Sequence, residues 1–250
     1  MSSLPVEEGK ILYVTHGSAV MSSMADVDIT NLAPCSHEEA DTRLLLHVED
    51  AVQSGCSKVC VRTVDTDVVV LAVAMFYQIA PEELWIAFGT GSNFHYIPVH
   101  EVVAAMDPRV CATLHVFHAF TGCDTTSSFG GRGKKTAWNT WKVFPEVSAA
   151  FEDLLLMQDT ISNSTMSTLE RFVILLYDRT SDLIEINEAR KQLFTRKSRS
   201  LESIPPTLAA LEQHIKRVSY QSNCWNKALI ADPDLPSPAD WGWKKDQTGW

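Results

Sequence analysis

The order of β-rich and helical segments in the first half of the chain restricts its fold more than any other sequence feature. Short runs rich in aliphatic and aromatic residues lie at 11–15, 58–64, 84–89 and 94–99. Segments with helical patterns follow them, at 36–55, 68–80, 100–106 and 110–120. Strands alternating with helices are typical of a parallel sheet covered on both faces. We therefore expect an α/β core with a parallel sheet.

The second half of the chain has a different character, because the β signal disappears after about Trp138. Helical patterns cover 143–156, 167–178, 186–196 and 207–221, and the final segment 232–250 is rich in Pro, Asp and Trp. The sequence thus predicts four regions: an N-terminal strand with an irregular segment (1–33), a core (34–142), an α-helical extension (143–222) and an irregular Trp- and Pro-rich tail (223–250).

Composition sets limits on the class of protein. The chain has 250 residues, of which 45% are hydrophobic and 21% charged, as in globular proteins. A net charge of -10 argues against a protein that coats nucleic acid over its whole surface. It does not argue against a nuclease, which gathers carboxylates at one site. Without an apolar run of about 18 residues or a signal-peptide pattern in "MSSLPVEEGK", we expect an intracellular protein, nuclear or cytoplasmic, with no membrane partner.

Acidic residues gather at the ends of predicted elements. Glu38, Glu39 and Asp41 lie in the first part of the helix expected over 36–55, for which Ser36 is the expected N-cap. Ligand sites of open α/β sheets lie at the carboxyl ends of the strands. Hard cations such as Mg²⁺ and Mn²⁺ bind through several carboxylate oxygens. The acids at these element ends are Glu39, Asp41, Asp65, Asp67 and Asp124.

Several of the acids at the element ends also have a structural explanation. Glu38 and Glu39 suit a helix dipole, Asp67 suits an N-cap, and Asp124 suits an Asx-turn. The Asp-x-Asp at 65–67 is also found in haloacid-dehalogenase-type phosphatases. Those enzymes typically continue into a small residue and a Thr, whereas "DTDVVVL" continues directly into apolar residues. This difference disfavours a phosphatase.

Three motifs together resemble a known superfamily. They are "EAD" (39–41), "VDTDVVVLA" (64–72) and "GCDTTSSFGGRGKKTA" (122–137). Their order and spacing are similar to those of the PIN-like superfamily of 5′-nucleases, in its flap-endonuclease or XPG-type branch, over about 34–141. Three longer segments also resemble those of a large group of mobile-element-associated animal proteins: "SHEEADTRLLLH", "FTGCDTTSSFGGRGKKTAW" and "LPSPADWGWK".

The resemblance implies a three-layer PIN-like core and a metal-dependent nuclease. It implies that DNA or RNA is the partner and that Mg²⁺ or Mn²⁺ is the cofactor, with two ions that hydrolyse a phosphodiester. The implied catalytic metal ligands are Glu39, Asp41, Asp65, Asp67 and Asp124. Asp41 stands where the family has a longer Glu.

A glycine-rich basic turn follows Asp124. In the resemblance this turn is helix-hairpin-helix-like, and its backbone N–H groups and cationic side chains face phosphate. The implied nucleic-acid-binding residues are Gly131, Arg132, Gly133, Lys134 and Lys135. The structural alternative is an ordinary glycine turn that begins a helix.

The chain departs from the family at its first strand. That strand carries another catalytic Asp in the family, whereas "ILYVT" (11–15) has no acid at its end. We therefore expect an N-terminally incomplete core with one metal ligand fewer. The departure favours a second hypothesis, in which a catalytically degraded PIN-like fold acts as a module that binds nucleic acid or protein.

Three further features can be explained by packing or solvation as well as by function. His115 and His118 precede Asp124 on one predicted helix, and we expect them to pack rather than act at the site. Trp138 and Trp141 are three residues apart and are expected to pack a helix inward. The run 189–200 has five basic residues and no acid, which suits either a nucleic-acid-facing patch or a solvated helix end.

Overall fold

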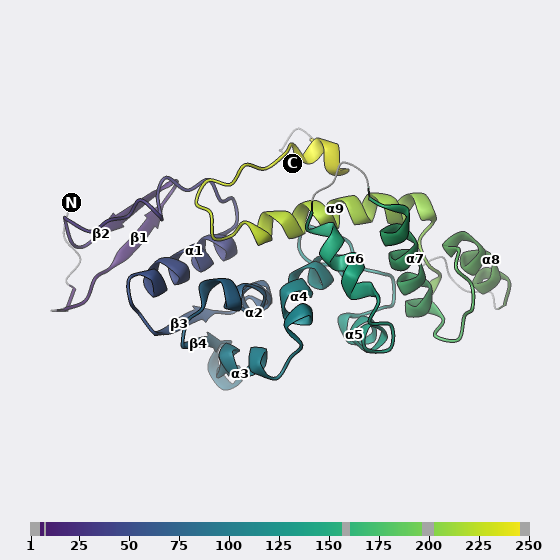
Figure 1. Cartoon of the computed structure of the whole chain (residues 1–250), viewed down its shortest axis with the longest axis horizontal. Helices are drawn as coiled ribbons and strands as arrows, with labels where there is room; N and C mark the ends of the chain where they lie inside the picture. Colours follow the sequence, from purple (N-terminus) through teal and green to yellow (C-terminus); the bar gives the residue numbers. More distant parts are fainter. Residues whose placement is uncertain (1–5, 8, 157–160, 197–202, 246–250) are drawn as a thin grey trace. The chain divides into compact units, whose positions relative to one another are not determined.

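The structure is a computed structural model that describes residues 6–7, 9–156, 161–196 and 203–245. The chain divides into two compact units (Figure 1). Unit 1 lies within 1–105 and 226–235, and unit 2 lies within 106–225 and 236–250. The boundary between the units, at residues 105 and 106, falls inside the core that the sequence predicts over 34–142. Unit 1 also includes the short segment 226–235 from near the end of the chain.

Unit 1 begins with a β-hairpin. Strands β1 (Tyr13–His16) and β2 (Ala19–Ser22) pair antiparallel, and Gly17 in the turn has a φ of +56°, which suits glycine. Val20 is buried in a small cluster with Leu32, Cys35 and Leu46. The predicted strand at 11–15 therefore exists, displaced by two residues at its start, and it pairs within a separate two-stranded sheet.

The rest of unit 1 alternates strands and helices around a three-stranded sheet with the order β3-β4-β5. The elements are α1 (Ala40–Gln53), β3 (Lys58–Thr63), α2 (Thr66–Ile79), β4 (Glu83–Phe88), η1 (Gly91–Asn93), β5 (His95–Pro98) and α3 (Val99–Ala104). Helix α1 contacts α2 and β3, and α3 contacts α2 and β4. The expected α/β class is confirmed for this unit.

The sheet is mixed, so the expected all-parallel sheet is wrong. Strands β3 and β4 are parallel and are joined through α2, whereas β5 is antiparallel to β4. Only residues 89–94 separate β4 from β5. Because a parallel crossover needs about a dozen residues or more, a connection this short returns the chain antiparallel.

Strand β3 is half-buried, whereas the apolar run "KVCVRTV" (58–64) predicts a buried strand. Val61 is buried, while Lys58, Cys60 and Arg62 are exposed. The alternation shows that one face of this strand packs inward and the other does not. The contiguous apolar letters concealed a period of two because Cys60 counted as apolar.

Helix α1 begins later than the sequence predicted. Its N-cap is Glu39, so the expected N-cap Ser36 is wrong and Glu38 precedes the helix. The Ser36 N–H donates to the Ala231 carbonyl at 2.9 Å, and the His37 Nε2 lies 2.6 Å from the Ile230 carbonyl oxygen. These bonds to a distant segment of unit 1 hold residues 36 and 37 outside the helix.

Unit 2 is helical, as predicted for most of its length. Its helices are α4 (Pro108–Phe120), α5 (Lys134–Val143), α6 (Val147–Leu154), α7 (Asn163–Tyr177), α8 (Ile186–Arg196), most of α9 (Leu208–Asn226), and the 3₁₀ turn η3 (Pro238–Trp241) in the tail. Helix α8 has the predicted bounds 186–196. None of the helices among the described residues is long and apolar enough to cross a membrane.

Aromatic side chains form the core of unit 2. Phe117 stacks on Trp141 with ring centroids 4.9 Å apart, and Phe120 contacts both Phe151 and Phe172. Trp141 is buried and Trp138 lies against Phe117, which confirms that this pair packs a helix inward. The predicted packing role of His115 is also confirmed, because its ring is fully buried.

Candidate metal centre

Two helix N-termini of unit 1 carry the candidate site. Asp41 is the second residue of α1, after the N-cap Glu39, and Asp67 is the second residue of α2, after the N-cap Asp65. An acid in the first turn is stabilised by the helix dipole. Asp65 lies two residues after the end of β3, so this cluster is at the carboxyl end of a parallel strand, as the sequence predicted for Asp65.

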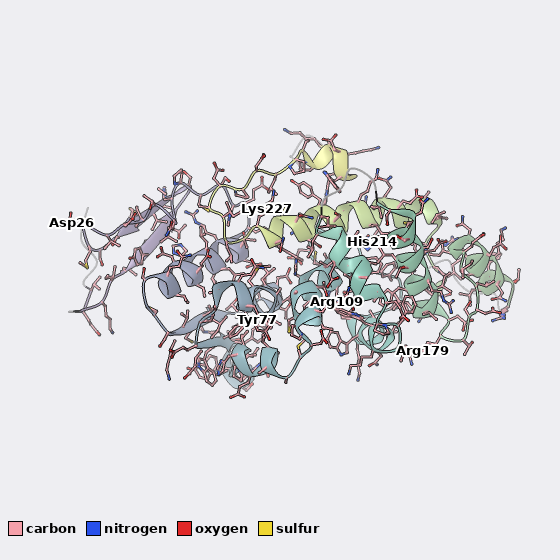
Figure 2. All side chains as sticks on the ribbon, viewed as in Figure 1. Asp26, Tyr77, Arg109, Arg179, His214 and Lys227 are labelled. Carbon is pink, nitrogen blue, oxygen red and sulfur yellow. The ribbon has the colours of Figure 1, made fainter. Side chains whose placement is uncertain are left out.

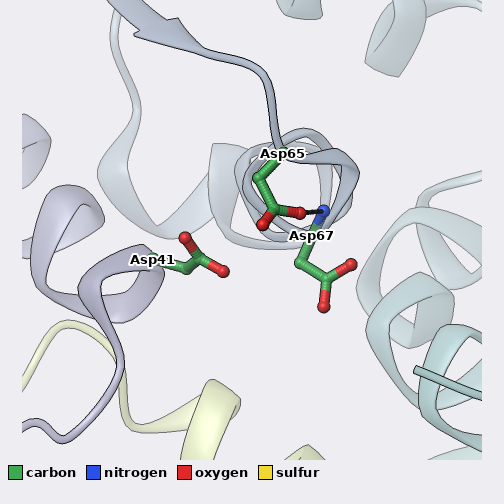
Figure 3. Close-up of side chains that lie close together, drawn as sticks. All are labelled: Asp41, Asp65 and Asp67. Atoms are coloured by element: carbon green, nitrogen blue, oxygen red, sulfur yellow. Dashed lines mark hydrogen bonds between the residues drawn. The ribbon is translucent and has the colours of Figure 1, made fainter. Parts of the chain in front are cut away.

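The structure brings three of the predicted ligands together. One carboxylate oxygen each from Asp41, Asp65 and Asp67 lie within 4.8 Å of one another (Figure 3). Asp41 projects from α1 toward the start of α2, where the other two side chains lie. Asp65 is exposed, whereas Asp41 and Asp67 are half-buried. The three acids are named the carboxylate cluster below.

Asp65 also has a structural role. One of its oxygens, Oδ1, accepts a hydrogen bond of 2.9 Å from the Asp67 N–H and so caps α2. Its own N–H donates to the Thr63 hydroxyl oxygen at 3.0 Å. The expected N-cap at Asp67 is therefore wrong by two residues, and the cap fixes the Asp65 side chain over the first turn of α2.

The donor set of the carboxylate cluster fits a hard divalent cation. Mg²⁺ binds oxygens at about 2.1 Å, so opposite ligand oxygens in an octahedron are about 4.2 Å apart. The 4.8 Å limit on the oxygen separations exceeds this by a margin that side-chain rotation can close. Two carboxylates 4.8 Å apart repel by about 1 kcal/mol in water, and a cation among them replaces this repulsion with attraction.

Glu39 is not a member of the carboxylate cluster. It is the N-cap of α1, where its backbone carbonyl accepts a 3.1 Å bond from the Thr42 hydroxyl, and its side chain does not cap the helix. In unit 1 the predicted set of four acids thus reduces to three. The displaced helix start explains this, because it places Glu39 outside the first turn.

Asp124 lies in unit 2, in a closed loop between α4 and α5. The Thr126 hydroxyl donates to the Ala119 carbonyl at 2.6 Å, and the Cys123 N–H donates to the Thr126 carbonyl at 3.2 Å. The Asp124 side chain is exposed and makes no hydrogen bond to another described residue, so the Asx-turn is not formed. The loop thus holds an exposed carboxylate on a hydrogen-bonded frame.

Lys134, expected to bind phosphate, has acceptors within unit 2. Its Nζ donates to the His118 carbonyl at 3.0 Å, the Thr121 hydroxyl at 3.1 Å and the Gly122 carbonyl at 2.5 Å. An ammonium group has three hydrogens, so these three acceptors use all of them. Lys134 therefore satisfies the carbonyl end of α4, and this role explains the residue without a phosphate.

The other residues of the predicted basic turn differ in their surroundings. Arg132 lies over the Tyr177 ring at 4.8 Å, and its guanidinium reaches the Tyr177 carbonyl at 3.4 Å. Gly131 has a φ of +66°, and Gly133 is the N-cap of α5. Lys135 is exposed. The structural alternative, a glycine turn that begins a helix, is present here. Lys134 and Lys135 are both exposed, but the ammonium group of Lys134 is bonded to acceptors of unit 2.

The sequence did not single out a second group of residues in unit 2. His214 and Arg217, one turn apart on α9, line a cavity together with Arg190 of α8. The helical spacing of 210, 214 and 217 was the available signal, since residues at this spacing share a helix face. The predicted basic run at 189–200 concealed the role of Arg190, and residues 197–200 of that run lie outside the described residues.

Comparison of the chain with protein-family models, with curated proteins and with solved structures found no match to any of the three.

Proposed function

We propose that the protein is a divalent-metal-dependent, PIN-like nuclease that hydrolyses phosphodiester bonds of DNA or RNA. The observation that carries the proposal is the carboxylate cluster, in which Asp41, Asp65 and Asp67 share one small volume at two helix N-termini. The motif order of the resemblance supports the same chemistry. Glu39 and Asp124 stay predicted ligands on the resemblance alone.

The residues of the cluster have distinct tasks in this proposal. Asp41 and Asp67 supply ligand oxygens from the first turns of their helices, and Asp65 supplies one while its cap holds the start of α2 in place. When bound, Mg²⁺ or Mn²⁺ lowers the pKa of a water and stabilises charge on the phosphate. The exposed Lys135 is a candidate for a weak phosphate contact.

A first test measures Mn²⁺ binding by calorimetry for the full chain and single variants. The variants Asp41→Asn, Asp65→Asn and Asp67→Asn each remove one charge, and Asn at position 65 keeps a good N-cap. We expect each variant to weaken Mn²⁺ binding by about tenfold or more, which corresponds to about 1.4 kcal/mol. Asp26→Asn, which changes an exposed acid of unit 1, is the matched control and should bind like the wild type.

A second test measures Mn²⁺-dependent cleavage of end-labelled single-stranded, flap and duplex DNA, and of RNA. Wild type and Asp26→Asn should cleave at least one substrate, and the three cluster variants should lose cleavage. Asp124→Asn tests the predicted fifth ligand separately. Metal binding without cleavage of any substrate would support the binding module instead, and the absence of Mn²⁺ binding by the wild type would refute both metal binding and nuclease activity.

A further inference from the structure

Unit 2 contains a cavity of about 300 Å³, and Asp124 is not among its lining residues. One wall is the loop segment 127–130, which includes Phe129, and another is the segment 204–206 before α9. Phe129, Ile204 and Pro205 are buried, so these walls are apolar. A volume of this size lies at the lower end of the range for small-molecule sites.

Two arginines, Arg190 and Arg217, are among the residues that line this cavity. Arg190 Nη1 donates to the Pro205 carbonyl, and Arg217 Nη1 donates to the Gly242 carbonyl at 3.2 Å. Each guanidinium has five N–H donors, so most donors remain after these bonds. Asp and Glu are absent from the described lining residues, and neither arginine has an ion pair among the described residues.

The other polar groups of the cavity are neutral. His214 Nε2 lies 2.9 Å from the Phe120 carbonyl, which can only accept, so this nitrogen carries the hydrogen. Nδ1 then has its lone pair toward the Ser127 hydroxyl at 3.4 Å. Burial lowers the pKa of His214, the hydrogen bond to the Phe120 carbonyl opposes this, and the charge of Arg217 makes a smaller contribution that lowers the pKa further. Burial raises the pKa of Tyr177, and the charges of Arg132 and Arg190 partly offset this rise.

The cavity therefore combines two positive charges with apolar walls and no compensating carboxylate. An uncompensated cation that is partly removed from water is costly, and a bound anion removes that cost. Guanidinium forks match the oxygens of phosphate, and a phosphate monoester carries nearly two negative charges at pH 7. A monoester dianion thus balances the two arginines, and a monovalent carboxylate does not.

We propose that this cavity binds a small phosphate monoester whose other half is a flat apolar group, with the phosphate on Arg190 and Arg217 and the apolar group against Phe129, Pro205 and Ile204. The site is separate from the carboxylate cluster, so it does not rest on the proposed nuclease activity. Ser127 and His214 lie at the same wall and report on occupancy.

The test uses the full chain in the presence of EDTA, so that no metal ion contributes to phosphate binding. Phenyl phosphate is titrated by calorimetry, with phenol, inorganic phosphate and benzoate as comparisons. We expect phenyl phosphate to bind, inorganic phosphate and benzoate to bind more weakly, and phenol not to bind. Arg190→Gln and Arg217→Gln should each weaken phenyl phosphate binding by about tenfold or more.

Arg179→Gln is the matched control, because Arg179 is an exposed arginine of unit 2 outside the cavity (Figure 2). It should leave binding unchanged. If the arginine variants do not fold, histidine NMR of the wild type decides: phenyl phosphate should shift the ring signals of His214 and leave those of exposed His95 in place. No binding by the wild type, equal binding by all three variants, or an unshifted His214 overturns the proposal.

Discussion

Asp65 combines two requirements in one side chain. Its Oδ1 completes the hydrogen bonding of the α2 N-terminus, and the same carboxylate contributes to the cluster with Asp41. Replacement by Ala removes both the cap and the charge, at a cost of about 1 kcal/mol for the cap alone. An effect of Asp65→Ala on metal binding therefore mixes stability with ligation, which is why the Asn variant is the informative one.

His115 makes the stability of the chain depend on pH. The ring is fully buried, and neither nitrogen has a hydrogen-bond partner among the described residues. Burial lowers the pKa of His115 from 6.5 to about 4. Between these pH values the unfolded chain binds a proton that the folded chain does not, so stability falls as the pH falls through this window.

We predict that the free energy of unfolding drops by about 1–2 kcal/mol between pH 6.5 and pH 5 because of this group alone. Urea unfolding at a series of pH values measures the drop. The His115→Leu variant should lose this part of the pH dependence, since Leu does not titrate. His16→Leu, at an exposed histidine, should keep the wild-type dependence. Parallel curves for wild type and His115→Leu would contradict the prediction.

At the residue scale the sequence predicted the carboxylate cluster better than the basic turn. Asp41, Asp65 and Asp67 lie at the ends of elements, where the sequence predicted acids, and the resemblance implied them as ligands. The role of Lys134 was not found, because its partners are backbone carbonyls at 118 and 122, and no sequence pattern marks a carbonyl as lacking a hydrogen bond. A Lys near glycines suggests phosphate and helix capping equally well.

At the scale of elements, the loop between α4 and α5 is fixed by a required glycine and by hydrogen bonds between the two helices. Gly122 has a φ of +105°, and a Cβ there would lie 2.7 Å from the Ser128 Cβ, so the turn requires glycine. Lys134 then reaches back from the start of α5 to the end of α4. The structure of this turn therefore explains why Gly122 and Lys134 occur in the segment "TGCDTTSSFGGRGK".

We predict that Lys134→Met destabilises the chain by about 1–3 kcal/mol, because buried acceptors at the end of α4 lose their donor. Lys135→Met, at the exposed neighbouring lysine, should change stability by less than about 0.5 kcal/mol. Thermal and urea unfolding of the two variants measure the difference. Equal stabilities would show that the Lys134 bonds contribute nothing.

The elements themselves were mostly predictable, and the exceptions have physical causes. Helix α8 and strand β3 lie within a residue of their predicted bounds, since hydrophobic periodicity decides them locally. The start of α1 was missed because residues 36 and 37 bond to 230 and 231, almost two hundred residues away. The antiparallel direction of β5 was not predicted, because apolar patterning does not indicate the direction of a strand. The direction follows from the short connection between β4 and β5.

At the scale of the whole molecule, unit 1 is discontinuous. Ala231 packs against the cluster of Val20, Leu32, Cys35 and Leu46, and its carbonyl accepts the Ser36 N–H. Lys227 donates to the Asp234 carbonyl within the same late segment. The segment 226–235 thus belongs to the packing of residues that precede it by two hundred positions.

We predict that Ala231→Asp in the full chain loosens the β1–β2 hairpin, because it places a carboxylate against an apolar cluster at a cost of about 2 kcal/mol or more. Hydrogen exchange of the amides in 13–22 should accelerate accordingly. Ala25→Asp, at an exposed alanine of the same unit, is the control and should leave exchange there unchanged. Slow exchange in both variants would show that the late segment does not stabilise the hairpin.

The late segment also sets an order of events during synthesis. Protein domains generally fold from the N-terminus as the ribosome releases them. Here the partners of Ser36 and His37 are residues 230 and 231, which leave the ribosome only after nearly all of unit 2 has been made. Unit 1 is therefore begun first, but it cannot be completed until residues 226–235 have followed most of unit 2.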